Sequence, residues 1–248
     1  MRIVHLHHHP HWSASRLVDL LREAGHDVEN RCPAVGDVLP DLASIDGVII
    51  GGGTVPVSAV DGHPAHQRSL AYVADAFAAG TRLFGVCLGA QMIATAADPS
   101  GAPVKVAPRP DGLTEFGYYP ICPTAAGAEL FTGLSTVFQA HYESCVVVPP
   151  GAELLASSPW FEVQAFSYGH RVIGVQFHPD VSAANLDAYH AANPVFDGRP
   201  GAQPRAAQRR GAERHDAAIA AWCVRVLDRW LEAPTIRRPR TATVAHAT

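Results

Sequence analysis

Short apolar runs alternate with segments of helical periodicity through the first 97 residues of this 248-residue chain. The apolar runs are residues 3–6, 47–50 and 83–86, and the helical segments are 16–24 and 65–79, each followed directly by a glycine. Short apolar runs separated by helical segments are typical of βαβ units, whose buried strands form a parallel sheet. The alternation predicts a doubly wound α/β fold.

The pattern changes after residue 105 to pieces that favour strands. They are "EFGYYPI", "CVVV", "EVQAFSYG" and "RVIGVQF", with "SYGHR" predicting a hairpin turn. Some of these strands are expected to be antiparallel. Residues 181–191 are expected to be helical, and we assign residues 1–192 to a single domain.

The C-terminal part contains a segment rich in Pro, Gly and Arg, at 193–211, which offers little to pack and predicts a loop. A helix over 212–232 follows, because its apolar residues recur on one face, and it is expected to pack on the same domain. The tail, 233–248, is expected to be disordered.

Composition excludes several classes of protein. A net charge of -4 with 48% hydrophobic residues indicates no bias toward nucleic acid or acidic membranes. Five cysteines form no CxxC pair, and their odd number is typical of a reducing compartment. The N-terminus lacks the features of a signal peptide, and no apolar run is long enough to span a bilayer. We therefore expect a cytoplasmic protein without nucleic-acid or membrane partners.

One cysteine, Cys87, lies between the apolar run 83–86 and the helix-like stretch "LGAQMIA". A strand, a tight turn and a helix in this order lift the turn residue above the carboxyl edge of a sheet. The helix N-terminus then favours the reactive thiolate. The alternative is a small thiol buried in the core, which is common for free cysteines.

A second strand end carries His178, directly after "RVIGVQF", and Asp180 follows two residues later. These residues suit a general base and the carboxylate that orients it. The alternative is a surface histidine beside Asp180 as a helix N-cap. A third strand end carries "GGG" at 51–53, whose amides can form an anion hole, although such glycine turns are common.

The three motifs "IIGGGTVPV", "GVCLGAQMIA" and "GVQFHPD", in this order, resemble class I glutamine amidotransferases, especially the stand-alone type similar to the glutaminase domain of GMP synthetase. The resemblance covers about residues 45–181. It implies a flavodoxin-like three-layer αβα sandwich with a mostly parallel central sheet. It also makes residues 1–192 the amidotransferase domain.

The resemblance implies a role for each matching residue. Cys87 would attack the glutamine amide, His178 would act as the base and Asp180 would orient it. The amides of Gly52 and Leu88 would form the oxyanion hole. The substrate-binding residues would be Gly53, Gln91, His141 and Tyr142. No metal and no cofactor are expected in this site.

The family usually has Glu where this chain has Asp180. Because a C–C bond is about 1.5 Å, the shorter carboxylate would miss the histidine by about that distance unless the backbone shifts. We expect that the triad works. The alternative is a site that reacts slowly until a partner protein rearranges it.

Ammonia from glutamine normally serves an activated acceptor, but the chain has no GxxxxGK[ST] loop and a single lysine, Lys105. Glutamine is therefore the expected substrate, and an ATP-dependent synthetase or ligase the expected partner. Two alternatives remain: a γ-glutamyl hydrolase of a γ-glutamyl amide or peptide, and a catalytically weak scaffold that binds a synthetase.

Three further features have both a functional and a structural interpretation. Arg109, Glu115, Tyr118 and Tyr119 either line the acceptor side or form an ordinary strand and turn. The Arg-rich segment 199–214 is either a docking or gating element or a solvated disordered insertion. His5, His7 and His9 share one face of a strand, but without a further ligand we interpret them as a strand running into a loop.

Overall fold

The structure is a computed structural model that describes residues 1–10, 15–98 and 106–232. An eight-stranded sheet forms its centre, in the order β2-β1-β3-β4-β12-β11-β10-β7. The strands of this sheet are β1 (Arg2–Leu6), β2 (Asp27–Arg31), β3 (Gly47–Ile50), β4 (Arg82–Val86), β7 (Cys122–Pro123), β10 (Glu153–Ser157), β11 (Ala165–Tyr168) and β12 (Val172–Val175). Strands β2, β1, β3, β4 and β12 are parallel, whereas β11, β10 and β7 join by antiparallel pairing.

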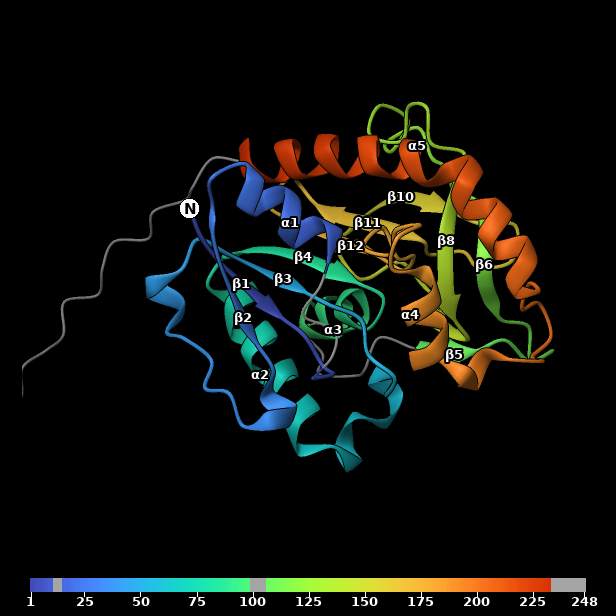
Figure 1. Ribbon diagram of the computed structural model, residues 1–248. Coiled ribbons are helices and arrows are strands. Elements are labelled where there is room, and N and C mark those ends of the chain that lie inside the picture. The colour runs from blue at the N-terminus through green and yellow to red at the C-terminus, as the bar shows by residue number, and fades with distance from the viewer. Residues whose placement is uncertain (11–14, 99–105, 233–248) are drawn as a thin grey trace, which may run out of the picture.

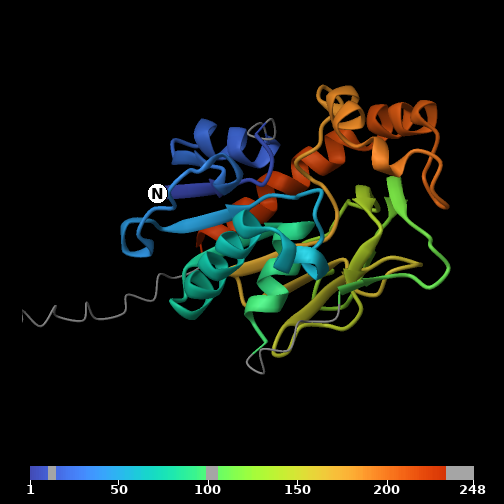
Figure 2. The same ribbon diagram turned by 90° about the horizontal axis from the view of Figure 1, so that it is seen from below.

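Helices cover both faces of the sheet (Figures 1 and 2). One face packs against α1 (Arg16–Glu23) and α5 (Arg205–Glu232), and the other against α2 (Pro64–Ala78) and α3 (Leu88–Ala96). The alternation of side chains along a strand creates the two cores: Ile3 of β1 contributes to the first, and its neighbour Val4 to the second. The prediction of a doubly wound, mostly parallel αβα sandwich is confirmed.

Two smaller sheets lie beside the central one. Strands β6 (Glu115–Pro120) and β8 (Thr136–His141) form one antiparallel pair, and β5 (Val106–Pro108) and β9 (Glu143–Cys145) form the other. The α4 helix (Leu186–Ala192) and a 3-10 turn, η4 (Pro194–Phe196), lie near β8 (Figure 1). These additions form one end of the molecule, next to the carboxyl ends of β4 and β12.

The predicted loop over 193–211 is wrong for much of its length. Helix α5 begins at Arg205 rather than at residue 212, and η4 occupies Pro194–Phe196. The side chain of Gln203 bonds to the backbone N–H and C=O of Tyr118 at 3.0 and 2.7 Å. Gly211 lets the helix approach this strand, because a Cβ there would lie 2.4 Å from the Tyr118 ring. The segment therefore packs on β6, and the interpretation of 199–214 as a disordered insertion fails for residues 205–214.

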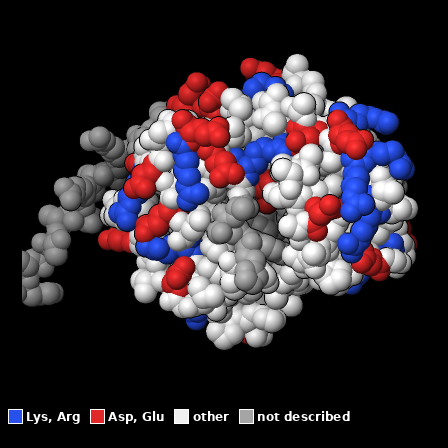
Figure 3. Space-filling model, viewed as in Figure 1, with Lys and Arg blue, Asp and Glu red and all other residues white. Residues whose placement is uncertain are grey.

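Two arginines of this segment form ion pairs at the surface. Arg205 pairs with Asp197 at 2.7 Å and Arg209 with Asp187 at 2.9 Å. Figure 3 shows charges of both signs over this face, with basic side chains gathered at the end where α5 begins.

The predicted disordered tail, 233–248, lies outside the described residues. Within the described part of the chain, no helix has both the length and the apolar character to cross a bilayer.

Other boundaries differ from expectation for local reasons. The helix expected over 181–191 starts only at Leu186, after a turn closed by Ser182 N–H on Asn185 Oδ1 at 2.7 Å. Asp180 is therefore not its N-cap.

The strand expected in "CVVV" ends at Cys145, and Val147 is 53% exposed. Strands β2, β8 and β10 were not predicted, and the β2 sequence "DVENR" contains a single apolar residue. The predicted hairpin turn between β11 and β12 is confirmed.

Candidate active site

Cys87 occupies the turn between β4 and α3, as the sequence predicts. Its backbone angles, φ 51° and ψ −108°, make it the only non-glycine residue with a positive φ in the described part of the chain. Such a conformation costs roughly 1–3 kcal/mol, so surrounding contacts must hold it. Strain of this kind is typical of a nucleophile elbow, in which the turn raises the side chain over the sheet edge.

Two glycines allow the tight turn. A Cβ on Gly85 would lie 2.6 Å from backbone atoms of Gly89 and Ala90, and a Cβ on Gly89 would lie 2.1 Å from the carbonyl oxygen of Ile50. No side chain fits at either position. The first turn of α3 therefore packs directly on the backbones of β3 and β4, which fixes where Cys87 stands.

The neighbouring strand β12 brings the histidine to the cysteine. Val175 pairs with Val86 across the parallel strands, and Cys87 N–H donates to Val175 C=O at 2.8 Å. Gln176 and His178, which follow this pair, therefore lie at the same edge as Cys87. His178 N–H donates to Phe138 C=O at 2.8 Å, which ties the turn to β8.

The imidazole of His178 is buried between two polar groups. Its Nδ1 lies 3.2 Å from Oδ1 of Asp180, and its Nε2 lies 3.3 Å from the hydroxyl of Tyr189 in α4. The expected shortfall of Asp180 does not occur, because the backbone after Pro179 brings the carboxylate within hydrogen-bond reach. Because a carboxylate only accepts, this contact places a proton on Nδ1.

The charges at this edge favour an imidazolium. Burial lowers the pKa of His178, but Asp180 and Cys87 outweigh it and raise the pKa to about 10. Burial likewise raises the pKa of Asp180, but the charge and hydrogen bond of His178 hold it below its usual range. His178 is therefore protonated at neutral pH, is paired with the carboxylate of Asp180 and lies beside the side chain of Cys87.

The glycine turn after β3 lies against both reactive side chains. A Cβ on Gly52 would lie 2.8 Å from Cε1 of His178 and 3.7 Å from Cβ of Cys87, and one on Gly53 would lie 2.4 Å from the Leu88 side chain. Among the described residues, the amides of Gly52 and Leu88 donate to no backbone acceptor. Two amides beside the cysteine are suited to hold a developing oxyanion.

A narrow pocket of about 40 Å³ opens beside the thiol. It brings together most of the residues that the sequence predicted for the site: Gly53, Cys87, Leu88, Gln91, His141, Tyr142 and His178. Residues of α4 and of the following turn, Tyr189, Asn193 and Phe196, also line it. Gly52 and Asp180 line an adjacent cavity on the other side of His178.

Gln176 is a buried residue of this site to which the sequence analysis gave no role. Its Nε2 donates to Cys87 Sγ at 3.4 Å, and its Oε1 accepts from Gln91 Nε2 at 3.3 Å. Gln91 also donates to the carbonyl of Glu143 at 3.2 Å, so its amide holds the pocket wall as well as facing the pocket. Its place in the sequence could have indicated a role, because Gln176 directly follows Val175, the β12 residue that pairs with the end of β4.

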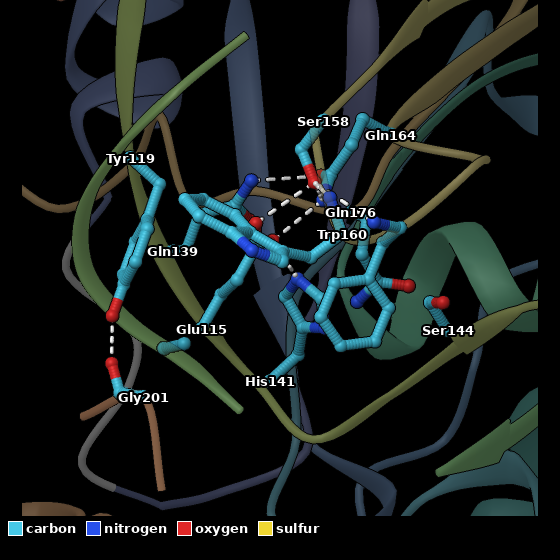
Figure 4. Close-up of polar contacts among 12 residues, drawn as sticks. Glu115, Tyr119, Gln139, His141, Ser144, Ser158, Trp160, Gln164, Gln176 and Gly201 are labelled. Atoms are coloured by element: carbon cyan, nitrogen blue, oxygen red, sulfur yellow. Dashed lines mark hydrogen bonds and ion pairs between the residues drawn. The ribbon is translucent and has the colours of Figure 1, made fainter. Parts of the chain in front are cut away.

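A buried carboxylate supports His141 from behind (Figure 4). Glu115, fully buried in β6, accepts from His141 Nε2 at 3.0 Å, Gln164 Nε2 at 2.7 Å and Ser158 Oγ at 2.8 Å. Gln164 in turn accepts from Gln139 at 2.8 Å. His141 Nδ1 is buried without a hydrogen-bond partner in the described structure. The network fixes the ring that lines the pocket.

Other residues singled out in the sequence lie away from the thiol. Arg109, Glu115, Tyr118 and Tyr119 do not line the pocket at Cys87, and Arg109 instead bonds to Asp111 at 2.8 Å. The described residues contain no group of three or more His, Cys, Asp or Glu side chains that could hold a metal ion. His5 and His7 stack with ring centroids 5.5 Å apart, as part of the strand and loop.

Comparison with known proteins agrees with this architecture. The family model for glutamine amidotransferase class I matches residues 15–197. A GMP synthase (glutamine-hydrolyzing) of Streptomyces avermitilis is 33% identical over 138 residues, which are 54% of this chain and 24% of that protein. A gamma-glutamyl-L-1-hydroxyisopropylamide hydrolase of a Pseudomonas species is 31% identical over 156 residues, 57% of this chain and 49% of that protein. The chain thus spans a quarter to a half of these curated relatives.

Solved structures share the fold over nearly the whole chain. A glutamine amidotransferase of Thermotoga maritima superposes with a TM-score of 0.81 at 22% identity, covering 94% of this chain and 99% of that one. A glutamine amidotransferase of Methylobacillus flagellatus superposes with a TM-score of 0.83 at 21% identity, covering 96% of this chain and 97% of that one. The chain therefore belongs to the class I glutamine amidotransferase family and is similar to the amidotransferases of GMP synthases.

Proposed function

We propose that the protein hydrolyses the side-chain amide of glutamine through a thioester on Cys87 and supplies the ammonia to an acceptor activated by a separate enzyme. The observation that carries the proposal is the position of Cys87. It occupies a strained turn beside a protonated His178 that Asp180 holds at 3.2 Å. A thiol kept only for packing needs neither the strain nor the buried charges.

The proposed reaction uses residues on three strand ends. The Cys87 thiolate attacks the amide carbon, and the oxyanion forms beside the amides of Gly52 and Leu88, each worth about 3 kcal/mol in comparable sites. His178 donates its proton to the departing ammonia. It then takes a proton from the water that attacks the thioester, which releases glutamate.

The proposed substrate contacts come from the pocket wall. Gln91, His141 and Tyr142 surround the space beside the thiol, together with the backbone of Gly53. Glu115 fixes His141, and Gln176 fixes Gln91. These contacts support the assignment of the four wall residues to glutamine binding.

A separate synthetase partner is supported by what the chain matches. The GMP synthase relative is named as glutamine-hydrolyzing, and the matched region is 24% of its length. The chain has no GxxxxGK[ST] loop for ATP in its sequence. An acceptor activated with ATP on another protein therefore fits the proposed chemistry.

The test is covalent trapping of the nucleophile. Intact-mass analysis after treatment with 6-diazo-5-oxo-norleucine is expected to show one adduct on the wild type and none on Cys87→Ala. Cys122→Ser, at an exposed cysteine, serves as the matched control and should retain the adduct. Ammonia release from glutamine should likewise be seen with the wild type and Cys122→Ser and be lost in Cys87→Ala. Absence of both adduct and ammonia release in the wild type would leave the catalytically weak scaffold as the better interpretation.

The partner needs its own measurement. Ammonia release by the chain alone is compared with release in the presence of a purified ATP-dependent synthetase or ligase, its acceptor substrate and ATP. Formation of aminated product from glutamine, and its loss with Cys87→Ala, is expected. If product forms from free ammonia but never from glutamine, that enzyme is not the partner.

A second candidate function is hydrolysis of a substituted γ-glutamyl amide. The relative from Pseudomonas is named for such a substrate, and it aligns with more of this chain than the GMP synthase of Streptomyces avermitilis does. The same cysteine and histidine would cleave either amide. The two functions differ in the size of the leaving amine, so parallel assays with glutamine and with substituted amides distinguish them.

A further inference from the structure

A second cavity lies on the other side of His178 from the pocket at Cys87. It has a volume of about 190 Å³, against about 40 Å³ for the pocket beside the thiol. The cavity is therefore several times larger than the pocket and exceeds the space that a single water molecule needs. Ammonia alone does not require such a space.

The two spaces meet at the catalytic histidine. His178 and Tyr189 line both, and the glycine turn divides them, with Gly53 on the pocket side and Gly52 on the cavity side. Nε2 of His178, the atom that would deliver a proton to the leaving nitrogen, lies 3.3 Å from the Tyr189 hydroxyl. A substituent on that nitrogen would therefore start at this junction, where the larger space is available.

The walls of the cavity offer hydrogen-bond acceptors. His7 Nδ1 lies 2.9 Å from the carbonyl of His9, and because a carbonyl only accepts, its Nδ1 carries the proton. His5 Nδ1 lies 3.1 Å from Asn30 Oδ1, and burial lowers the pKa of His5 to about 4. The His5 ring is thus neutral and is left with an unprotonated Nε2 as an acceptor. The carboxylate of Asp180 adds a negative charge to the same cavity.

The rest of the lining is mostly small and apolar, and includes Val181 and also Ala188 and Ala192, which lie one turn apart on α4. Asn185 adds an amide, whose Oδ1 accepts from Ser182 N–H at 2.7 Å. An occupant must therefore combine a short aliphatic part with a hydrogen-bond donor. A short amino alcohol has this character.

We propose that this cavity is the subsite for the leaving amine of an N-substituted γ-glutamyl amide, and that it selects a short aliphatic amine bearing a hydroxyl group. The inference rests on the proposed thioester chemistry of Cys87 and extends it to a substrate class. The hydroxyl donates to the acceptor side formed by His5 and Asp180, and the aliphatic part contacts Ala188 and Ala192.

The reaction balances with water as the only co-reactant. The Sγ–C bond forms as the C–N bond breaks, and the proton on His178 Nε2 passes to nitrogen, so that the neutral amine leaves into the cavity. Water then breaks the Sγ–C bond, giving glutamate and returning a proton to His178. The products are glutamate and the free amine.

The test compares substrates of matched size. Wild-type kcat/KM is measured for glutamine, γ-glutamyl-ethanolamide and γ-glutamyl-propylamide, the last two having the same number of non-hydrogen atoms. The ethanolamide is expected to exceed the propylamide at least tenfold, because only its hydroxyl can donate to the acceptors. Equal rates for these two, or no cleavage of either while glutamine is hydrolysed, would overturn the amine subsite and leave the proposed glutaminase function standing.

A variant of the cavity wall provides the second arm. Ala188→Leu fills the space from an exposed helix position and is expected to lower the ratio of kcat/KM for ethanolamide to that for glutamine about tenfold. Ala191→Leu, on the same helix but outside the cavity, should keep the ratio within about twofold of the wild type. An unchanged ratio in Ala188→Leu would also overturn the subsite. If the wild type cleaves neither glutamine nor the amides, both the subsite and the proposed function fail.

The reverse direction gives an independent readout. Ethanolamine added to a reaction with glutamine should compete with water for the thioester and yield γ-glutamyl-ethanolamide, detected by mass. The fraction of product diverted to this amide should fall in Ala188→Leu and stay unchanged in Ala191→Leu. If the wild type releases ammonia but forms no γ-glutamyl-ethanolamide at high ethanolamine concentration, the amine does not occupy the cavity.

Discussion

Asp180 Oδ1 lies 3.2 Å from His178 Nδ1, although only Pro179 separates the two residues in the chain. The family usually places a longer glutamate at this position, and the shorter side chain nevertheless reaches the imidazole. The backbone after β12 therefore compensates for the missing methylene. His178 also bonds through its own amide to Phe138, so the turn is held from the main chain as well as from the side chain.

Replacement of Asp180 tests this compensation. Asp180→Asn is expected to lower kcat for glutamine by about 100-fold or more, because the amide removes the charge that stabilises the imidazolium. Asp180→Glu is also expected to lower kcat, by about tenfold, because the extra methylene pushes the imidazole away from a fitted position. Steady-state ammonia release measures both. A Glu variant faster than the wild type would show that the shorter side chain limits the rate.

The raised pKa of His178 predicts the pH dependence of glutamine hydrolysis. Burial lowers this pKa, Asp180 and Cys87 raise it to about 10, and the proton on His178 is therefore retained up to mildly alkaline pH. Because His178 must donate a proton to the departing ammonia, kcat/KM for glutamine is expected not to fall between about pH 7 and pH 9. In Asp180→Asn the largest contribution that raises this pKa is lost, so the fall should begin at lower pH. A wild-type kcat/KM that already falls around pH 6.5, the ordinary histidine pKa, would contradict the ion pair.

Gln176 is predicted to support the thiolate. Gln176→Leu removes the donor 3.4 Å from Sγ and leaves Gln91 without its side-chain acceptor. A lost hydrogen bond to a charged group costs about 1.5–3 kcal/mol, so the alkylation rate at pH 7 and kcat/KM should each fall at least tenfold. Gln67→Leu, on the exposed side of α2, is the control. Normal alkylation in the Gln176 variant would remove it from the site.

The glycines around the elbow are predicted to be required for folding. Gly89→Ala places a Cβ 2.1 Å from the Ile50 carbonyl and is expected to lower the free energy of unfolding by about 2–4 kcal/mol. Gly62→Ala, where no atom lies within 4 Å of the added carbon, should change it by less than about 1 kcal/mol. Denaturant unfolding compares the two. Equal stabilities would mean that α3 shifts freely away from β3.

Glu115 is predicted to act through His141. Glu115→Gln keeps the shape but removes the buried charge that accepts from His141, Gln164 and Ser158. The KM for glutamine should rise about three- to tenfold with a smaller change in kcat, because the pocket wall loosens while the thiol and its base are untouched. An unchanged KM in a folded variant would limit the network to a structural role.

The sequence identified the elements with a clear apolar pattern. Buried strands such as β3 are short continuous apolar runs, and the amphipathic α5 has one apolar face at helical spacing, so both were predictable from the sequence. The start of α5 was not, because "PRAAQRRG" resembles a loop until Gly211 packs on Tyr118. Strand β2 was missed because an edge strand with charged residues has no apolar run.

The sequence by itself determined which residues could do chemistry: a cysteine between a strand and a helix, a histidine after another strand and a glycine turn after a third. Only the tertiary structure decided that they meet, because the pairing of Val86 with Val175 joins strands far apart in the chain. The same structure brought Gln176 to the sulfur, Tyr189 to the imidazole and a second cavity to the far side of His178. These contacts depend on strand register and on the packing of α4, which no local pattern encodes.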